Sequence, residues 1–138
     1  MKLFYVLDAC ALLAYFYDES GADFMQKIFD SARKNKLVIY MHAVNLLEVY
    51  YDICKTHGEN RAKNTLKQIK RFPMIINYEL SEDVINKAGA LKSKYRISLA
   101  DSVGLAQTVL LNASFITTDH HELDIVEKNE AIKFAWLR

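Results

Sequence analysis

The chain has 138 residues, a length that fits one domain spanning residues 1–138. Its hydrophobic fraction of 51% and charged fraction of 25% exclude a disordered chain, and one proline with four glycines argue against an all-β sandwich. With 18 basic and 17 acidic residues the formal net charge is +1, so bulk charge indicates neither a nucleic-acid nor a membrane partner. Any such argument must come from local charge.

The cysteines and the N-terminal stretch bear on localisation. Cys10 and Cys54 are too few for a disulfide scaffold, and no C-x-x-C or His/Cys cluster indicates structural zinc, so we expect two reduced core residues. The apolar N-terminal stretch is interrupted by Asp8 and lacks a small-x-small cleavage site. Its longest apolar run is far shorter than the roughly 20 residues of a membrane span. We therefore expect a cytoplasmic protein with no membrane partner.

Apolar runs and capping residues predict strands and helices that alternate along the chain. In chain order these are strand 3–7, helix 9–17, helix 20–36, strand 37–41, helix 42–57, helix 59–71, strand 74–76, helix 81–95, helix 99–112, strand 114–117, a short helix from 119 or 120, and strand 132–136. Ser20 and Asp23 are spaced as a capping box for the second helix, and Ser81 and Ser98 cap later ones. The alternation is typical of an α/β domain with a mostly parallel sheet.

Four acids stand where an α/β protein builds sites or where a charge is costly. Asp8 and Asp119 follow the strands at 3–7 and 114–117, and ligands bind beyond the carboxyl ends of such strands. Glu48 and Asp101 lie on strongly apolar helices, where an uncompensated carboxylate needs a partner or a metal. Clustered carboxylate oxygens suit hard cations such as Mg²⁺ and Mn²⁺.

Each acid also has a purely structural interpretation. Asp8 and Asp119 could be helix N-caps, and Ser98-x-x-Asp101 matches a capping box. Glu48 could pair with a lysine or arginine. Taken singly, these interpretations are the more common ones. The combination of four acids, with no basic residue adjoining them in these segments, favours a metal site.

The four acids lie in four segments that follow one another along the chain. They are Val6-Leu7-Asp8-Ala9-Cys10-Ala11-Leu12-Leu13-Ala14, Asn45-Leu46-Leu47-Glu48-Val49, Ser98-Leu99-Ala100-Asp101-Ser102-Val103-Gly104-Leu105-Ala106 and Thr117-Thr118-Asp119-His120-His121-Glu122-Leu123. Together they resemble the successive motifs of PIN domains, most closely the VapC-like toxins of prokaryotic toxin–antitoxin systems. No single segment is specific; the ordered set, from Leu3 to about Leu137, carries the resemblance. It implies a three-layer α/β/α fold with a mostly parallel central sheet.

The resemblance also implies a site. The acids that it makes both metal ligands and catalytic residues, around one or two Mg²⁺ or Mn²⁺ ions, are Asp8, Glu48, Asp101 and Asp119. Ser98 and Thr117 match hydroxyl positions that often line such sites. Cys10 stands where the family usually has serine or threonine, which puts in doubt a hydrogen bond from this position but not the acidic set.

The implied chemistry is hydrolysis of RNA phosphodiesters. A bare carboxylate cluster would repel an anionic phosphodiester, and divalent ions reverse that sign. They also lower the pKa of a bound water and stabilise charge on the attacking and leaving oxygens. Direct attack by water then gives a 5′-phosphate and a 3′-hydroxyl.

Contact with the substrate is expected from local positive charge. Residues 55–71 have a local excess of +5 from Lys55, Arg61, Lys63, Lys67, Lys70 and Arg71 against Glu59. Lys63, Lys67 and Lys70 form a stripe at i, i+4 and i+7, which we expect to contact RNA phosphates. A second basic group is Lys87, Lys92, Lys94 and Arg96. Solvated helix faces explain both groups equally well.

Histidines and aromatic residues give weaker signals. His120 and His121 are adjacent, so their side chains diverge, and we expect surface or substrate-proximal positions rather than a shared metal. The cluster Tyr15, Phe16 and Tyr17 and the pair Tyr50 and Tyr51 are expected to be mostly core. The resemblance implies that part of this surface receives an antitoxin, and that the protein forms a homodimer.

The resulting prediction is a metal-dependent ribonuclease, the toxin of a toxin–antitoxin pair. The alternative is a non-catalytic PIN-like module that binds RNA or acts as a scaffold, and retention of all four acids argues against it. A phosphoacceptor receiver domain is also α/β, but it needs closely paired acids beside one acceptor aspartate and a strand-end lysine. The sequence offers neither feature.

Overall fold

The computed structural model describes residues 2–138 and contains a five-stranded sheet in which every strand pair is parallel. The strand order is β3-β2-β1-β4-β5. The strands are β1 (Leu3–Leu7), β2 (Leu37–His42), β3 (Ile75–Asn77), β4 (Ser114–Thr117) and β5 (Lys133–Trp136). The predicted α/β class is confirmed, and the predicted mostly parallel sheet is parallel throughout.

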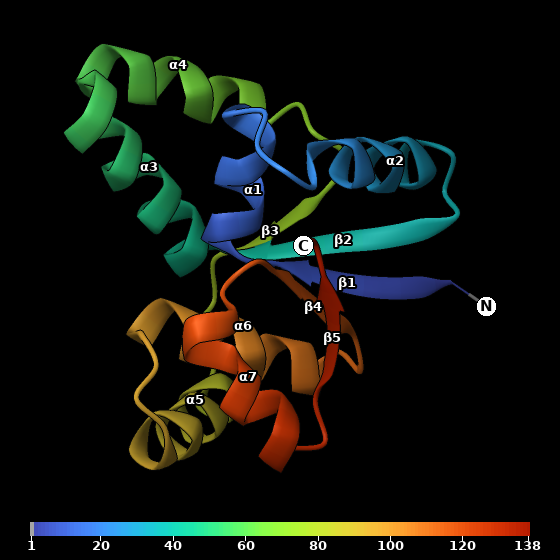
Figure 1. The fold of residues 1–138 in the computed structure, drawn as a ribbon, viewed down its shortest axis with the longest axis vertical. Coiled ribbons are helices and arrows are strands. Elements are labelled where there is room, and N and C mark those ends of the chain that lie inside the picture. The colour runs from blue at the N-terminus through green and yellow to red at the C-terminus, as the bar shows by residue number, and fades with distance from the viewer. Residues whose placement is uncertain (1) are drawn as a thin grey trace.

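In residues 2–138, seven helices cover the two faces of the sheet and make three α/β/α layers (Figure 1). One face carries α1 (Ala9–Phe16), α2 (Ala22–Arg33), α3 (Ala43–His57) and α4 (Glu59–Ile69). The other face carries α5 (Glu82–Lys94), α6 (Leu99–Leu110) and α7 (His120–Asn129). None of the helices in residues 2–138 is long and apolar enough to cross a membrane.

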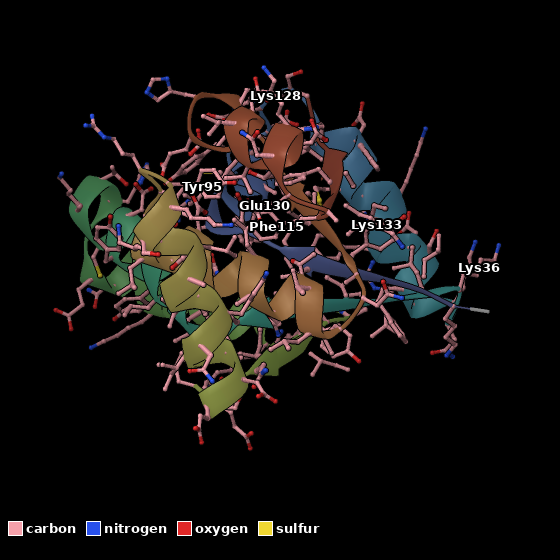
Figure 2. The ribbon with its side chains drawn as sticks, turned by 90° about the horizontal axis from the view of Figure 1, so that it is seen from below. Lys36, Tyr95, Phe115, Lys128, Glu130 and Lys133 are labelled. Atoms are coloured by element: carbon pink, nitrogen blue, oxygen red, sulfur yellow. The ribbon has the colours of Figure 1, made fainter. Side chains whose placement is uncertain are left out.

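The central strand β1 divides the apolar core into two parts. Because neighbouring side chains of a strand point to opposite faces, Leu7 packs with Phe29 on the α1–α2 side, whereas Val6 packs with Phe115 on the α6–α7 side. All four side chains are buried. Figure 2 shows Phe115 in the interior and Lys128 at the periphery. Burial on both faces is what an all-parallel sheet requires.

The start of α2 differs from the predicted capping box. The helix begins at Ala22, and its N-cap is Gly21 with φ +101°, which makes no side-chain capping bond. A Cβ at Gly21 would lie 2.5 Å from Leu137 Cγ. The start at Ser20 was therefore wrong, because a contact with the far end of the chain sets this turn. Only glycine combines the positive φ with so close an approach.

The cysteines and aromatic residues divide between core and surface. Both cysteines are free, as expected, but they are half-buried rather than fully inside the core. Tyr15 makes edge contacts with Phe29 and Phe72, and Phe16 stacks on Phe72 with ring centroids 5.7 Å apart. These two aromatic side chains belong to the core, as predicted. Tyr17 is 40% exposed.

Close packing at Gly104 gives a test of the fold. A Cβ there would lie 2.8 Å from Phe115 Cε1 and 3.1 Å from Asn45 Nδ2, where α6 meets α3 and β4. We expect Gly104→Ala to lower the free energy of unfolding by about 1–3 kcal/mol, since the neighbours must shift. The matched control is Gly89→Ala on α5, where no atom lies within 4 Å of the added Cβ. It should gain up to about 1 kcal/mol from helix propensity. Urea unfolding measures both, and equal effects would contradict the packing described.

Candidate active site

Two of the four predicted acids lie at the carboxyl ends of adjacent central strands. Asp8 follows β1, Asp119 lies just beyond β4, and the two strands pair in parallel with Leu7 opposite Ile116. The Asp8 N–H donates to the Ile116 carbonyl at 3.2 Å, so strand pairing continues to the acid itself. Both acids therefore emerge at the same edge of the sheet, where α/β proteins bind ligands.

Asp8 is both a helix cap and an available ligand. Its side chain is fully buried, and Oδ1 accepts a hydrogen bond from the Ala11 N–H at 2.8 Å, which caps α1. Oδ2 is also buried and has no hydrogen-bond partner among the described residues. Burial, and then the surrounding carboxylates, raise the pKa of the neighbouring Cys10 thiol well above its usual range. The structural interpretation of Asp8 is thus correct for one oxygen and leaves the other for a cation.

Asp101 stands beside a capping box that a different residue completes. Ser98 caps α6 as predicted, since its Oγ accepts from the Asp101 N–H at 3.0 Å. In a complete box the Asp101 carboxylate would accept the Ser98 N–H in return. That N–H donates instead to Oε1 of Glu122, from α7. Asp101 is a buried residue, 4% exposed, and its carboxylate remains available to the site.

Asp119 caps α7 in the same way that Asp8 caps α1. Its Oδ1 accepts from the Glu122 N–H at 3.1 Å, and its own N–H donates to the buried Thr117 Oγ1 at 3.1 Å. Although burial raises the pKa of Asp8, the nearby Thr117 hydroxyl opposes that rise. Thr117 therefore supports two acids, Asp119 by geometry and Asp8 by electrostatics.

Glu48 reaches the site from α3, whose start is held by a buried histidine. His42 is the N-cap, and its Nδ1 accepts from the Val44 N–H at 3.1 Å. Its Nε2–H donates to the Glu79 carbonyl at 2.7 Å, and this second bond fixes the ring. None of the ion pairs among the described residues includes Glu48, so pairing with a lysine or arginine does not explain this acid.

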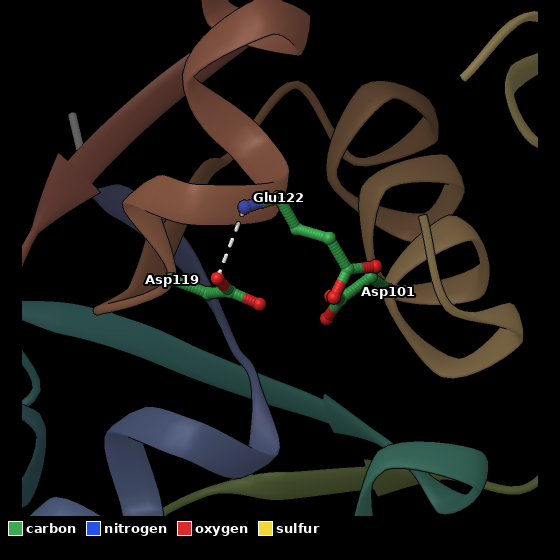
Figure 3. Close-up of side chains that lie close together, drawn as sticks. All are labelled: Asp101, Asp119 and Glu122. Carbon is green, nitrogen blue, oxygen red and sulfur yellow. Dashed lines mark hydrogen bonds between the residues drawn. The ribbon is translucent and has the colours of Figure 1, made fainter. Parts of the chain in front are cut away.

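The structure adds a fifth acid, Glu122, to the four predicted ones. One carboxylate oxygen from each of Asp101, Asp119 and Glu122 lies within 4.8 Å of the others (Figure 3). Glu122 belongs to the last of the four segments, but it is not among the four acids predicted from the sequence. Its position three residues after the cap Asp119 is the signal that could have found it, because i and i+3 share a helix face.

Burial and the charge of neighbouring carboxylates raise the pKa of Asp8, Glu48, Asp101 and Glu122. Burial is the larger cause, and it raises the pKa of Asp8 to about 7 and that of Asp101 to about 8, with nearby carboxylates adding to both. The pKa of Glu48 is raised by burial and then by Glu122 and Asp119. Burial likewise raises the pKa of Glu122. For each of these four acids, the charge of at least one other acid of the site contributes to the rise.

The basic residues lie outside this cluster. Lys63 and Lys67 are exposed on α4, and Lys70 is exposed at the C-cap of this helix. Lys63 is paired with Glu59 at 3.0 Å. Of the second group, Lys94 pairs with Glu130, and the Lys92 amine donates to the Ile97 carbonyl at 2.7 Å. The predicted surface positions of His120 and His121 are confirmed, since both are exposed.

The donor set suits a hard divalent cation. All of the candidate ligand atoms are carboxylate oxygens, the type that Mg²⁺ and Mn²⁺ prefer. The buried and unpartnered Asp8 Oδ2 is costly without a cation or a proton. A cation would satisfy it and would relieve the repulsion that raises the neighbouring pKa values.

The raised pKa of Asp101 makes metal-free stability depend on pH. In the unfolded chain an aspartate has a pKa of about 3.9. Folding raises the pKa of Asp101 to about 8. Folding therefore favours the protonated form, and the folded state loses stability as pH rises from about 4 to about 8. Asp101→Asn removes that loss. We expect this variant to melt increasingly above the parent, by at least about 3 °C near pH 8.5, in thermal unfolding with EDTA.

The control for this pH series is Asp23→Asn, an exposed acid in the first turn of α2. Both variants lose a favourable charge near a helix N-terminus, but only Asp101→Asn also relieves repulsion within a cluster. The melting difference for Asp23→Asn should stay nearly constant across the series. A constant difference for Asp101→Asn as well would contradict the electrostatics described here.

Comparison with known proteins identifies the family. The family model described as the PIN domain matches residues 5–129. Among curated protein sequences, none matches this chain. The fold is similar to a chain of VapBC2 from Rickettsia felis bound to a promoter DNA fragment, with a TM-score of 0.72, 14% identity, and coverage of 97% of this chain and 98% of that one.

Two further solved structures share the fold at low identity. A chain of DNA-bound VapBC from Salmonella typhimurium gives a TM-score of 0.71 with 11% identity and 99% coverage of both chains. A toxin–antitoxin complex from Klebsiella pneumoniae gives 0.68 with 18% identity, covering 97% of this chain and 98% of that one. The family match excludes the alternative of a phosphoacceptor receiver domain. This chain belongs to the PIN domain family.

Proposed function

We propose that this protein is a metal-dependent ribonuclease, the VapC-like toxin of a toxin–antitoxin pair, acting in the cytoplasm. One observation carries the proposal. Asp101, Asp119 and Glu122 converge at the same carboxyl edge of the sheet as Asp8, and Asp8 is fully buried and keeps an oxygen with no partner among the described residues. A protein that only binds RNA has no use for so costly a cluster, because carboxylates repel phosphates.

The residues that would hold Mg²⁺ or Mn²⁺ are Asp8, Glu48, Asp101, Asp119 and Glu122. Such ions, when bound, lower the pKa of a water and stabilise charge on the attacking and leaving oxygens of the phosphodiester. The protein's own contribution is preorganisation. Capping bonds fix the Asp8 and Asp119 carboxylates, and the Ser98 N–H fixes Glu122. The acids therefore meet substrate in positions that the fold has already set.

Cleavage of labelled RNA tests the proposal. Asp8→Asn keeps an oxygen that can cap α1 but removes the charge, so the variant should fold and lose activity. We expect the rate in Mg²⁺ or Mn²⁺ to fall by about 100-fold or more. Asp23→Asn, which changes an exposed acid outside the cluster, should cleave as the parent does.

Two outcomes would overturn the enzymatic proposal. One is full activity of Asp8→Asn, and the other is cleavage that persists in EDTA. RNA binding by the parent without cleavage, at millimolar Mg²⁺ or Mn²⁺, would instead support the alternative of a non-catalytic PIN-like module that binds RNA or acts as a scaffold.

We propose that the α4 lysines bind RNA phosphates, and the salt dependence of binding tests this. In an Asp8→Asn background, which prevents cleavage, Lys67→Gln and Lys70→Gln should each reduce the slope of log K against log salt by about 0.7 on single strands. Lys63→Gln should have a smaller effect because Glu59 already partly neutralises its charge. Lys128→Gln on α7 is the control. Unchanged slopes would move the contact to the group Lys87, Lys92, Lys94 and Arg96.

We further propose that the antitoxin binds along α3 and α4. A groove of about 350 Å³ there is lined by Leu47, Tyr50, Leu66 and Tyr78, and Leu47 and Tyr78 are well exposed. Apolar grooves of this kind take amphipathic helices or extended segments. The solved structures of similar fold include complexes named as toxin–antitoxin or VapBC. Co-purification with the product of a small reading frame adjacent to this gene tests the proposal.

The α5–α6 face is our proposal for the homodimer contact. A groove of about 580 Å³ is lined by Leu80, Ile85, Leu99 and Val103. We expect Ile85→Glu to convert a dimer to a monomer in analytical ultracentrifugation, since a charge must then be buried. Ile125→Glu on α7 changes an isoleucine of similar exposure, 54% against 56%, and should leave the dimer intact. A parent that sediments as a monomer would overturn the homodimer.

A further inference from the structure

His120 is the first residue of α7 and follows Asp119 directly, but its side chain contacts residues outside the acidic cluster. Its Nδ1 lies 2.7 Å from Asp124 Oδ1, one turn further along the helix. Its Nε2 lies 2.7 Å from the Arg138 carbonyl oxygen. The imidazole also stacks on Trp136, with ring centroids 3.7 Å apart and planes inclined by 14°. Both ring nitrogens face acceptors, so neither is available as a metal ligand.

The residues that hold His120 are themselves anchored. The Trp136 indole N–H donates to Glu127 Oε2 at 3.0 Å, which ties β5 to α7. The Arg138 guanidinium donates to the Ser20 carbonyl at 3.2 Å and lies 3.4 Å from Glu19 Oε1 in the α1–α2 loop. His120 is therefore held by Trp136 of β5 and by Arg138, which in turn contacts the loop after α1.

Residues 136–138 also hold the turn that carries Asp119. The Leu137 N–H donates to the Thr117 carbonyl at 3.0 Å, and the Thr117 hydroxyl accepts the Asp119 N–H. The turn from Thr117 to His120 is thus held at both ends by residues 136–138. Asp119 sits between the two anchors with backbone angles of φ −87° and ψ 72°, which lie outside the helical and extended regions.

We propose that His120 is a positioning residue for the metal site. Through its stack on Trp136 and its bonds to Asp124 and Arg138, it fixes the turn that carries Asp119. The inference rests on the proposed function, because it assigns His120 a task toward the ion that this function requires. Groups that orient a metal ligand from outside the first coordination sphere typically contribute 10- to 100-fold in metal affinity.

The test is Mn²⁺ affinity measured by isothermal titration calorimetry, a readout independent of cleavage. We expect His120→Ala and Trp136→Ala each to weaken Mn²⁺ binding by about tenfold or more. A variant with both His120→Ala and Trp136→Ala should have nearly the same Mn²⁺ affinity as the single variant that binds Mn²⁺ less tightly, because both changes break the same contact. Trp136→Phe keeps an aromatic face and should retain most of the affinity. In His120→Ala, saturating Mn²⁺ should restore kcat.

The matched control is Tyr95→Phe, which acts on the opposite end of α7. There the Tyr95 hydroxyl donates to Glu130, the C-cap of the helix, and Figure 2 shows the two side chains pointing toward one another. This variant loses a bond that secures α7 but leaves the Asp119 turn untouched, so Mn²⁺ affinity should stay within about twofold. His120→Gln covers the case in which His120→Ala fails to fold. Its amide can still donate one bond, so its affinity should lie between those of the parent and the alanine variant.

The outcomes separate this inference from the proposed function. If the parent binds Mn²⁺ and His120→Ala or His120→Gln binds it equally well, the inference fails and the nuclease proposal stands. If Tyr95→Phe loses as much affinity as His120→Ala, the effect is general destabilisation and the inference again fails. A parent that binds no Mn²⁺ overturns both.

Discussion

The cost of burying carboxylates close to one another is the constraint on which the rest of this structure depends. Acids gather at one edge of a parallel sheet, and burial makes the ionised forms of Asp8 and Asp101 expensive, so that the pKa values of both are raised. The fold offsets part of this cost with backbone N–H groups at the starts of α1 and α7, which bond the Asp8 and Asp119 carboxylates. Helix N-termini also carry partial positive charge, so this sheet edge is the favourable place for such a cluster.

The capping and metal-site interpretations of these acids are compatible, because a carboxylate has two oxygens. In Asp8 one oxygen caps α1 and the other is unpartnered among the described residues. In the α6 box Ser98 caps the helix, while Glu122 accepts the bond that Asp101 would otherwise use. Capping therefore orients the site residues without consuming them. This explains why a sequence pattern that is common in ordinary helices can also mark a functional site.

The sequence predicts most of this fold, because its strands are short apolar runs and its helices have clear periodicity. The predicted elements all occur, with ends that shift by a few residues at most. The features that the sequence does not predict depend on contacts between residues far apart in the chain. The start of α2 is set by Leu137 against Gly21, and the role of Glu122 depends on Ser98, 24 residues earlier. Local pattern carries no information about such pairs. Asp8, Glu48, Asp101 and Asp119 could be singled out because strand ends and an apolar helix context mark each one locally, and their function as metal ligands stays a prediction.

The strand order also decides when the acids can meet. The first strand of the chain lies at the centre of the sheet, and its partner β4 begins more than 100 residues later, with Leu7 opposite Ile116. Pairing at such separation is slow, and a chain emerging from a ribosome cannot complete it until β4 has been made. Asp8 and Glu48 are synthesised early, but Asp101, Asp119 and Glu122 follow only in the last third of the chain. A nascent chain therefore carries an incomplete acidic cluster for most of its synthesis, and the cluster can be completed only after β4 has been made.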